Sequence, residues 1–120
     1  KIKASPIVAI ISYDTQFYEY LPELFPVKDV SGLYRENPAK AESTALRNSS
    51  LQGAYFMLAA RAIGLDVNGI SGFHNEIIDE AFFADGRYKS NFLCCIGYGN
   101  TEGLHPRGPR LGFDTVCEIL

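Results

Sequence analysis

The stretch "GAYFMLAARAIGL", residues 53–65, decides most of the fold. Proline is absent from residues 39–63, and apolar side chains recur there at helical spacing, at Leu51, Ala54, Tyr55, Leu58 and Ala62. Gly64 follows at the position where a helix can end in the left-handed conformation. Within it "GAYFMLAA", residues 53–60, is apolar on nearly every side, and such a helix is buried all round. We therefore predict a helix over 39–63, part of which faces a second chain or another large element.

Two apolar runs predict buried strands on either side of this helix. Residues 7–13, "IVAIISY", are rich in β-branched side chains, and residues 91–98 read "NFLCCIGY". Between the first run and the helix, prolines and a glycine interrupt residues 14–38, so we predict an irregular segment with at most short helical turns.

Two further helices are expected. "NEIIDEAFF", residues 75–83, predicts a short amphipathic helix with His74 or Asn75 as its cap. Its inward-facing side chains would be Ile77, Ile78, Ala81 and Phe82. A last helix, "FDTVCEIL", would begin near Asp114. This order of elements indicates an α+β or α/β domain with a layered sheet.

Composition limits the possible functions. The chain has 120 residues, of which 47% are hydrophobic and 21% charged, as in one globular domain. Its net charge of -3 gives no basic field for nucleic acid or an anionic membrane. The opening "KIKASPIVAII" has basic residues before an apolar run, but the run is short and no small-residue cleavage pattern follows it. No stretch approaches the length of a membrane span, so we expect a soluble protein.

The cysteines and histidines do not form a metal pattern. Cys94, Cys95 and Cys117 match neither a zinc site nor a disulfide framework, and we interpret them as reduced, with Cys94 and Cys95 in the core. Reduced cysteines favour the cytoplasm. His74 and His105 are the only histidines, and their spacing is not that of a zinc site.

Several motifs together carry a resemblance to a known family. The chain reads "SSLQGAYFMLAARAIGLDVNGISGF", then "NFLCCIGYGN", then "HPRGPRLGFD", and its first strand is followed by "YDTQFYEYLPELFP". In order and spacing these segments resemble the nitroreductase family of flavin enzymes, and within it the malonic semialdehyde reductase branch. The similarity covers essentially all 120 residues.

The resemblance implies an α+β fold with a layered sheet and flanking helices, and an intertwined homodimer with a flavin site at each interface. The helix over 39–63 would be the central dimer helix. Family members begin with two arginines around a serine that grip the flavin, and nothing in this chain matches that segment. Residues 1–120 are therefore expected to be the C-terminal portion of a single nitroreductase-like domain.

The resemblance also implies a binding site for the cofactor FMN. In the family, the loop matching "GISG" lies against the isoalloxazine ring, so Ser71 and Gly72 would donate main-chain hydrogen bonds to it, and Gly69 and Ile70 would line it. Many members have an acidic residue where Ser71 stands, so one local charge is missing here. Without the resemblance, the same glycines would simply permit a helix entry.

A basic residue near the end of the family's chain helps to bind the FMN phosphate. Arg110 matches it best, and Arg107 is a second candidate three positions earlier. Guanidinium groups bind phosphate oxygens bidentately. The alternative for both is an exposed loop with solvated arginines.

The activity implied is transfer of hydride from NADH or NADPH through FMN to a second substrate, with no catalytic side chain assigned. Closeness to the malonic semialdehyde reductase branch implies reduction of malonic semialdehyde to 3-hydroxypropionate. The alternatives are a nitro or quinone reductase of the same family, and a non-catalytic fragment that binds flavin or dimerises.

Overall fold

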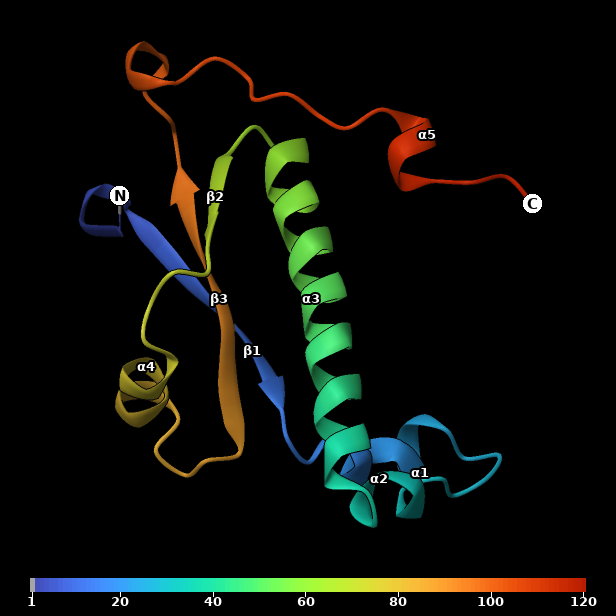
Figure 1. Ribbon diagram of the computed structural model, residues 1–120. Helices are drawn as coiled ribbons and strands as arrows, with labels where there is room; N and C mark the ends of the chain where they lie inside the picture. The colour runs from blue at the N-terminus through green and yellow to red at the C-terminus, as the bar shows by residue number, and fades with distance from the viewer. Residues whose placement is uncertain (1) are drawn as a thin grey trace.

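The computed structural model describes residues 2–120 and shows an α+β architecture (Figure 1). Three strands form one antiparallel sheet in the order β1-β3-β2, with bounds Ile7–Asp14 for β1, Asp66–Ile70 for β2 and Tyr88–Gly97 for β3. The long helix α3, Pro38–Ala62, packs along the sheet (Figure 1). The fold class and both predicted strands are confirmed.

β3 is the central strand and carries most of the core. Its run of four buried residues, Leu93 to Ile96, is covered from both sides, as expected for a continuous apolar strand. Opposite β1 the register shifts between Ile11 and Ser12, so that Asn91 is an extra residue on β3. Such a bulge re-aims side chains locally. The amide of Asn91 donates to the hydroxyls of Ser49 and Ser50 on α3, at 3.2 and 3.0 Å.

β2 was not predicted from the sequence. Its five residues, "DVNGI", include an asparagine and a glycine, which are depleted in strands. Pairing with β3 from Asp66 opposite Gly97 to Ile70 opposite Leu93 holds this segment extended. Gly69 and Ile70 are therefore strand residues, and the loop that was predicted to include them begins at Ser71.

α3 has the predicted position and end signals. The side chain of Asn37 caps it by accepting a hydrogen bond from the Lys40 N–H at 3.0 Å. Gly64 adopts φ +86°, and the Leu65 N–H donates to the Ala60 carbonyl at 3.0 Å, which closes the helix.

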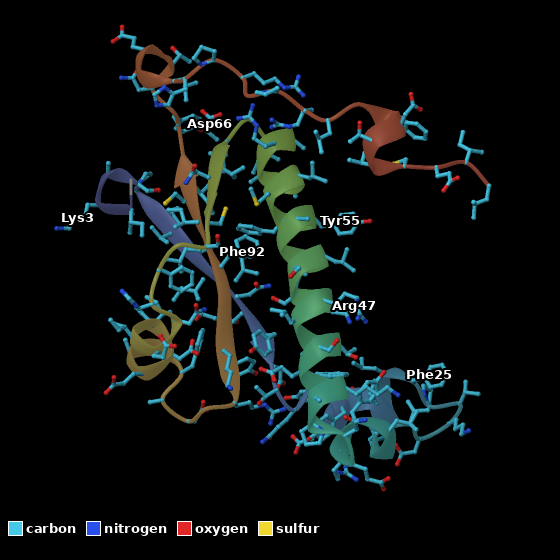
Figure 2. All side chains as sticks on the ribbon, in the orientation of Figure 1. Lys3, Phe25, Arg47, Tyr55, Asp66 and Phe92 are labelled. Carbon is cyan, nitrogen blue, oxygen red and sulfur yellow. The ribbon has the colours of Figure 1, made fainter. Side chains whose placement is uncertain are left out.

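Within the described chain, α3 is buried on one side only. Its buried residues are all small: Ala41, Ala45, Ser49, Gly53 and Ala60. Small side chains let the helix lie close to the sheet, where Phe92 points toward it (Figure 2). Tyr55 and Leu58 are 73% and 65% exposed, and Tyr55 points away from the sheet (Figure 2). The prediction that this helix is buried all round is therefore not met within the described chain, where these large apolar side chains are exposed.

The segment between β1 and α3 contains only short helices, as predicted: η2 at Phe17–Tyr20, α1 at Leu21–Leu24 and α2 at Gly32–Arg35. A further 3-10 turn, η1, covers Ile2–Ala4. The guanidinium of Arg87 ties this segment to the start of β3, because it contacts Asp14 at 3.0 Å and Glu19 at 2.9 Å.

α4, Asn75–Phe82, confirms the predicted amphipathic helix but not its predicted inward face. Ile77, Ala81 and Phe82 are exposed, and only Ile78 of the four is half-buried. The helix binds β3 through the polar side chains of Asn75 and Asp79, which are hydrogen-bonded to Ser90.

The C-terminal segment lies against little of the body. After η3, Thr101–Gly103, helix α5 covers only Phe113–Val116, so the prediction of a helix reaching Leu120 is wrong. Every residue from Tyr98 to Leu120 is exposed, and a single turn without tertiary packing does not propagate. The radius of gyration is 17.9 Å, whereas a compact chain of this length has about 13.6 Å.

Candidate functional site

Four of the six predicted site residues line one open hollow at the end of β2. Its volume is about 580 Å³, and its lining consists of Ile2, Lys3, Asn68, Gly69, Ile70, Ser71 and Gly72. Ile2 and Lys3 of η1 line it together with residues 68–72, although β3 separates β1 from β2 in the sheet. The structure therefore places the "GISG" segment at an accessible surface rather than inside the core.

The loop presents free backbone donors. Among the backbone hydrogen bonds of the described residues, neither the Ser71 N–H nor the Gly72 N–H has a partner, and the local contact is Phe73 N–H to the Ser71 carbonyl at 3.1 Å. Apart from its two neighbours in the chain, no residue that the structure describes has a heavy atom within 4 Å of the place where a Cβ on Gly72 would be. A flat ligand can therefore approach these peptide groups closely. Unpaired N–H groups in such a concavity favour an acceptor-rich or anionic ligand.

Lys3 is a lining residue that the sequence analysis missed. It is the charged side chain of the hollow, and it lies 65 or more positions before the other lining residues except Ile2. No local sequence signal could have found it, since its placement beside residues 68–72 depends on the tertiary fold. Figure 2 shows that its side chain extends outward from η1.

Arg107 and Arg110 do not line this hollow. Both are exposed on the segment that follows η3, and Arg110 Nη1 donates to the carbonyls of Gly108 and Pro109 at 3.0 and 3.1 Å. Within one chain the structure therefore brings together Gly69, Ile70, Ser71 and Gly72, but not the two arginines.

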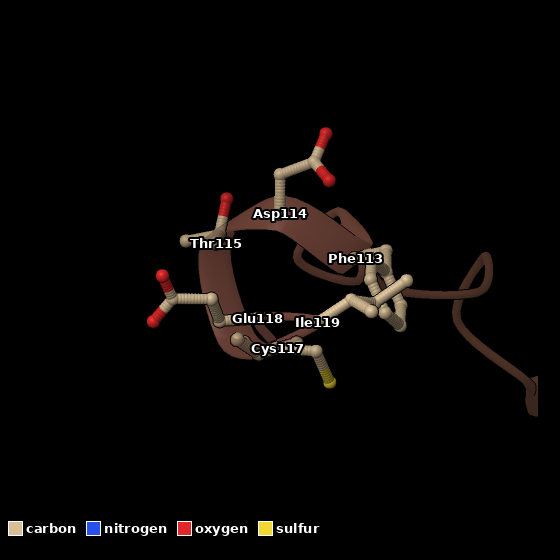
Figure 3. A pocket seen from close by; sticks show the side chains of 7 residues that line it. Phe113, Asp114, Thr115, Cys117, Glu118 and Ile119 are labelled. Carbon is tan, nitrogen blue, oxygen red and sulfur yellow. The ribbon is translucent and has the colours of Figure 1, made fainter.

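A second hollow, of about 630 Å³, lies within the turn of α5 (Figure 3). It is lined only by the consecutive residues 113–119. One exposed turn with no other element beside it offers no fixed walls, so we do not consider it a binding site.

The cysteines occupy the expected places. Cys94 and Cys95 are buried in β3 and Cys117 is exposed, all three as free thiols. Burial raises the pKa of the Cys94 thiol, which keeps it protonated and unreactive. Within residues 2–120 no group of three or more His, Cys, Asp or Glu side chains could hold a metal ion. None of the helices in this range has the length and hydropathy needed to cross a bilayer.

The α+β fold, with backbone donors beside a hollow at the end of a strand, defines only a broad class of ligand-binding proteins. Comparison with known proteins identifies the family within this class. The family model described as "Nitroreductase family" matches residues 3–98. The chain belongs to the nitroreductase family.

Relatives and solved structures agree with this assignment. A protein from Rhodopseudomonas palustris (strain TIE-1), named as a candidate NADH dehydrogenase/NAD(P)H nitroreductase, is 52% identical over 120 residues, which are 100% of this chain and 61% of that protein. One from Polynucleobacter asymbioticus, with the same name, is 53% identical over 100% of this chain and 61% of its own length. The chain thus spans about three fifths of these relatives.

The solved structures show the same fold. A Bacillus subtilis nitroreductase superposes with a TM-score of 0.89 at 25% identity, over 98% of this chain and 65% of that one. A nitroreductase from Exiguobacterium sibiricum, solved in complex with FMN, gives a TM-score of 0.84 at 25% identity, over 99% and 64% of the two chains.

Proposed function

We propose that the protein containing this chain is an FMN-dependent NAD(P)H oxidoreductase whose flavin ring lies against Gly69, Ile70, Ser71 and Gly72. The observation that carries the proposal is the pair of N–H groups at Ser71 and Gly72, which have no backbone partner among the described residues and belong to two residues that line the hollow. These donors suit the acceptor atoms N5 and O4 of a flavin. A related structure contains FMN, which supports the same ligand.

FMN, when bound, would accept hydride from NADH or NADPH and pass it to a second substrate. The residues of this chain would hold the ring and tune it. Fixed N–H dipoles near N5 and O4 favour the added electron density of the reduced ring. Lys3, which also lines the hollow, would add a positive charge with the same effect. No side chain of the hollow is assigned as a general acid or base.

The phosphate of FMN is proposed to bind Arg110, with Arg107 as a second contact. Both guanidinium groups are exposed, and prolines restrict the backbone around them. They lie outside the hollow of their own chain, so this part of the proposal requires that the C-terminal segment packs differently in the assembled protein or contacts the site of a second copy.

A homodimer is part of the proposal. The exposed surface of the chain is 9414 Å², whereas a compact monomer of this mass exposes about 6,450 Å². The excess includes the apolar side of α3 and the apolar residues of the C-terminal segment. Obligate interfaces of about 2,000–5,000 Å² are typically hydrophobic, so a second copy on α3 would account for much of this surface.

For the second substrate we propose malonic semialdehyde, reduced to 3-hydroxypropionate. Lys3 supports it, because an ammonium group beside the ring would attract the substrate's carboxylate. Nitro or quinone reduction is the second candidate, and the names of the relatives favour it. The free cysteines Cys94 and Cys95 support a cytoplasmic location as part of the same proposal.

The test is titration of the purified protein with FMN, followed by anaerobic addition of NADH or NADPH and then of each substrate class. We expect a bound flavin that bleaches with the nicotinamide and recovers its colour with the aldehyde. Recovery only with a nitroaromatic or quinone would select the second candidate. A folded dimer that binds no flavin would identify this chain as a non-catalytic scaffold.

Arg110→Ala tests the phosphate contact. Loss of a charged hydrogen-bonding group should weaken FMN binding by about 1–3 kcal/mol. Lys89→Ala, which removes an exposed cation from β3, is the matched control. Equal FMN affinity in the two variants would remove Arg110 from the site.

A further inference from the structure

Ser90 of β3 is buried, with 5% of its surface exposed, at a point where the sheet has no strand on one side. β2 pairs with β3 only between Leu93 and Gly97. On the N-terminal side of Leu93, where β2 no longer pairs with β3, side chains of α4 bind the backbone of β3 instead. Asp79 Oδ1 accepts a hydrogen bond from the Ser90 N–H at 2.8 Å, and Asn75 Nδ2 donates to the Ser90 carbonyl at 2.8 Å.

The two side chains that hold Ser90 come from one face of α4. Asn75 and Asp79 are four positions apart, which places them one above the other on a helix. Asn75 Nδ2 also donates to Ser90 Oγ at 2.9 Å. Both backbone groups of Ser90 and its hydroxyl are therefore bound to α4, and the residue is a fixed point of attachment.

This attachment lies directly beside the loop of the candidate site. Asn75 is the first residue of α4, so only 71–74 separate it from the end of β2. At the other end, Ile70 pairs with Leu93. The loop is thus held at both ends on the same strand, three residues apart on β3. Its N-terminal end is held by a sheet ladder, and its C-terminal end by Asn75 and Asp79.

We infer that Asn75, Asp79 and Ser90 form a clamp that positions the Ser71 and Gly72 N–H groups toward the ring of the bound flavin. Asn75 and Asp79 are positioning residues, since they act through the loop and do not line the hollow. The inference rests on the proposed function for the ligand, but the clamp itself rests on the contacts with Ser90. A displacement of about 1 Å at a reacting centre can lower a rate about a hundredfold.

The chemistry of the clamp dictates the variants. Asn75→Asp keeps the shape of the side chain but replaces the donor with a carboxylate that repels the Ser90 carbonyl. Asp79→Asn keeps an acceptor oxygen for the Ser90 N–H, whereas Asp79→Ala removes it. Glu80→Ala changes an exposed carboxylate on the same helix and is the control.

Two readouts are measured for each variant. The first is the rate of flavin reduction by NADH at saturating FMN, followed by stopped-flow absorbance. The second is hydrogen exchange of the peptide that covers 71–74 in the protein without added FMN. Asn75→Asp and Asp79→Ala should slow reduction about tenfold or more and speed exchange of this peptide, with exchange at 93–97 unchanged. Asp79→Asn and Glu80→Ala should stay within about threefold of the parent rate.

The outcomes separate the clamp from the proposed function. A parent protein that neither binds nor reduces FMN would refute the proposed function, while exchange would still report on the clamp. A parent that reduces FMN, with Asn75→Asp equal to it in rate and exchange, would overturn the clamp. If Asn75→Asp does not fold, the same comparison is made between Asp79→Ala and Asp79→Asn, and equal behaviour of these two would overturn it.

Discussion

Gly53 sets the distance between α3 and the sheet, so Gly53→Ala is the sharpest test of the packing. A Cβ at this position would lie 2.4 Å from Phe92 Cζ, 2.7 Å from Phe92 Cε1 and 3.1 Å from Ile11 Cγ2. Carbon atoms in contact normally lie about 3.5–4.0 Å apart. Either the ring or the helix must therefore move by about 1 Å.

Two opposing effects determine how much Gly53→Ala changes the free energy of unfolding. Alanine in a helix interior is about 1 kcal/mol more favourable than glycine. Inserting a methyl group into a packed core costs about 1–3 kcal/mol, and the distances to a rigid ring place this case at the upper end. We therefore expect a net loss of about 1–2 kcal/mol in the free energy of unfolding, measured by urea denaturation at constant protein concentration.

A double-mutant cycle identifies the cause. Phe92→Leu removes the ring atoms that the new methyl group would meet. In that background Gly53→Ala should be neutral or stabilising by up to about 1 kcal/mol, because the helix-propensity gain is then opposed only by the milder contact with Ile11 Cγ2. Gly53→Ala that stabilises the parent protein, or a cycle with no coupling, would refute the close approach of α3 to β3.

Three further predictions follow from exposure, charge and burial. Leu58→Glu places a charge on the exposed apolar side of α3 and should shift the protein from dimer to monomer in light scattering, while Glu80→Lys should not. Arg87→Ala leaves the Asp14 carboxylate without its partner and should lower the unfolding midpoint more than Arg87→Lys does. Iodoacetamide should label Cys117 rapidly and Cys94 only on unfolding. Burial raises the pKa of the Cys94 thiol above its value of about 8.5 in the unfolded chain. The contribution of this thiol to the free energy of unfolding is therefore fully present below about pH 8.5 and is lost as the pH rises through the pKa of the folded state.

The elements that the sequence predicted correctly carry their own local signals. The long helix has a periodic pattern, a proline at its start and Gly64 at its end, and these fix its bounds within a residue. The strand at 91–98 is a continuous apolar run. Neither signal depends on the rest of the chain, so both can be recognised without the fold.

The sequence predictions are wrong where tertiary contacts determine the local structure. "DVNGI" forms β2 because β3 offers a ladder, although its composition is poor for a strand. α4 turns Asn75 and Asp79 toward β3 because Ser90 needs partners there, which outweighs its apolar face. The clamp could not be predicted from the sequence. Ser90 lies 11 residues from Asp79 and 15 residues from Asn75, and only the fold brings these side chains together.

The same reasoning explains why the candidate site could be predicted only in part. The residues around the "GISG" loop are consecutive, so their placement together follows from the chain itself. The placement of Lys3 beside this loop depends on the tertiary fold, and the two arginines lie on a segment with no buried residue. The proposed dimer would explain three features together. These are the exposed apolar side of α3, the extended C-terminal segment and the distance of the two arginines from the hollow. A second surface that covers α3 would also give the C-terminal segment something to pack against, and its arginines would then be held rather than solvated.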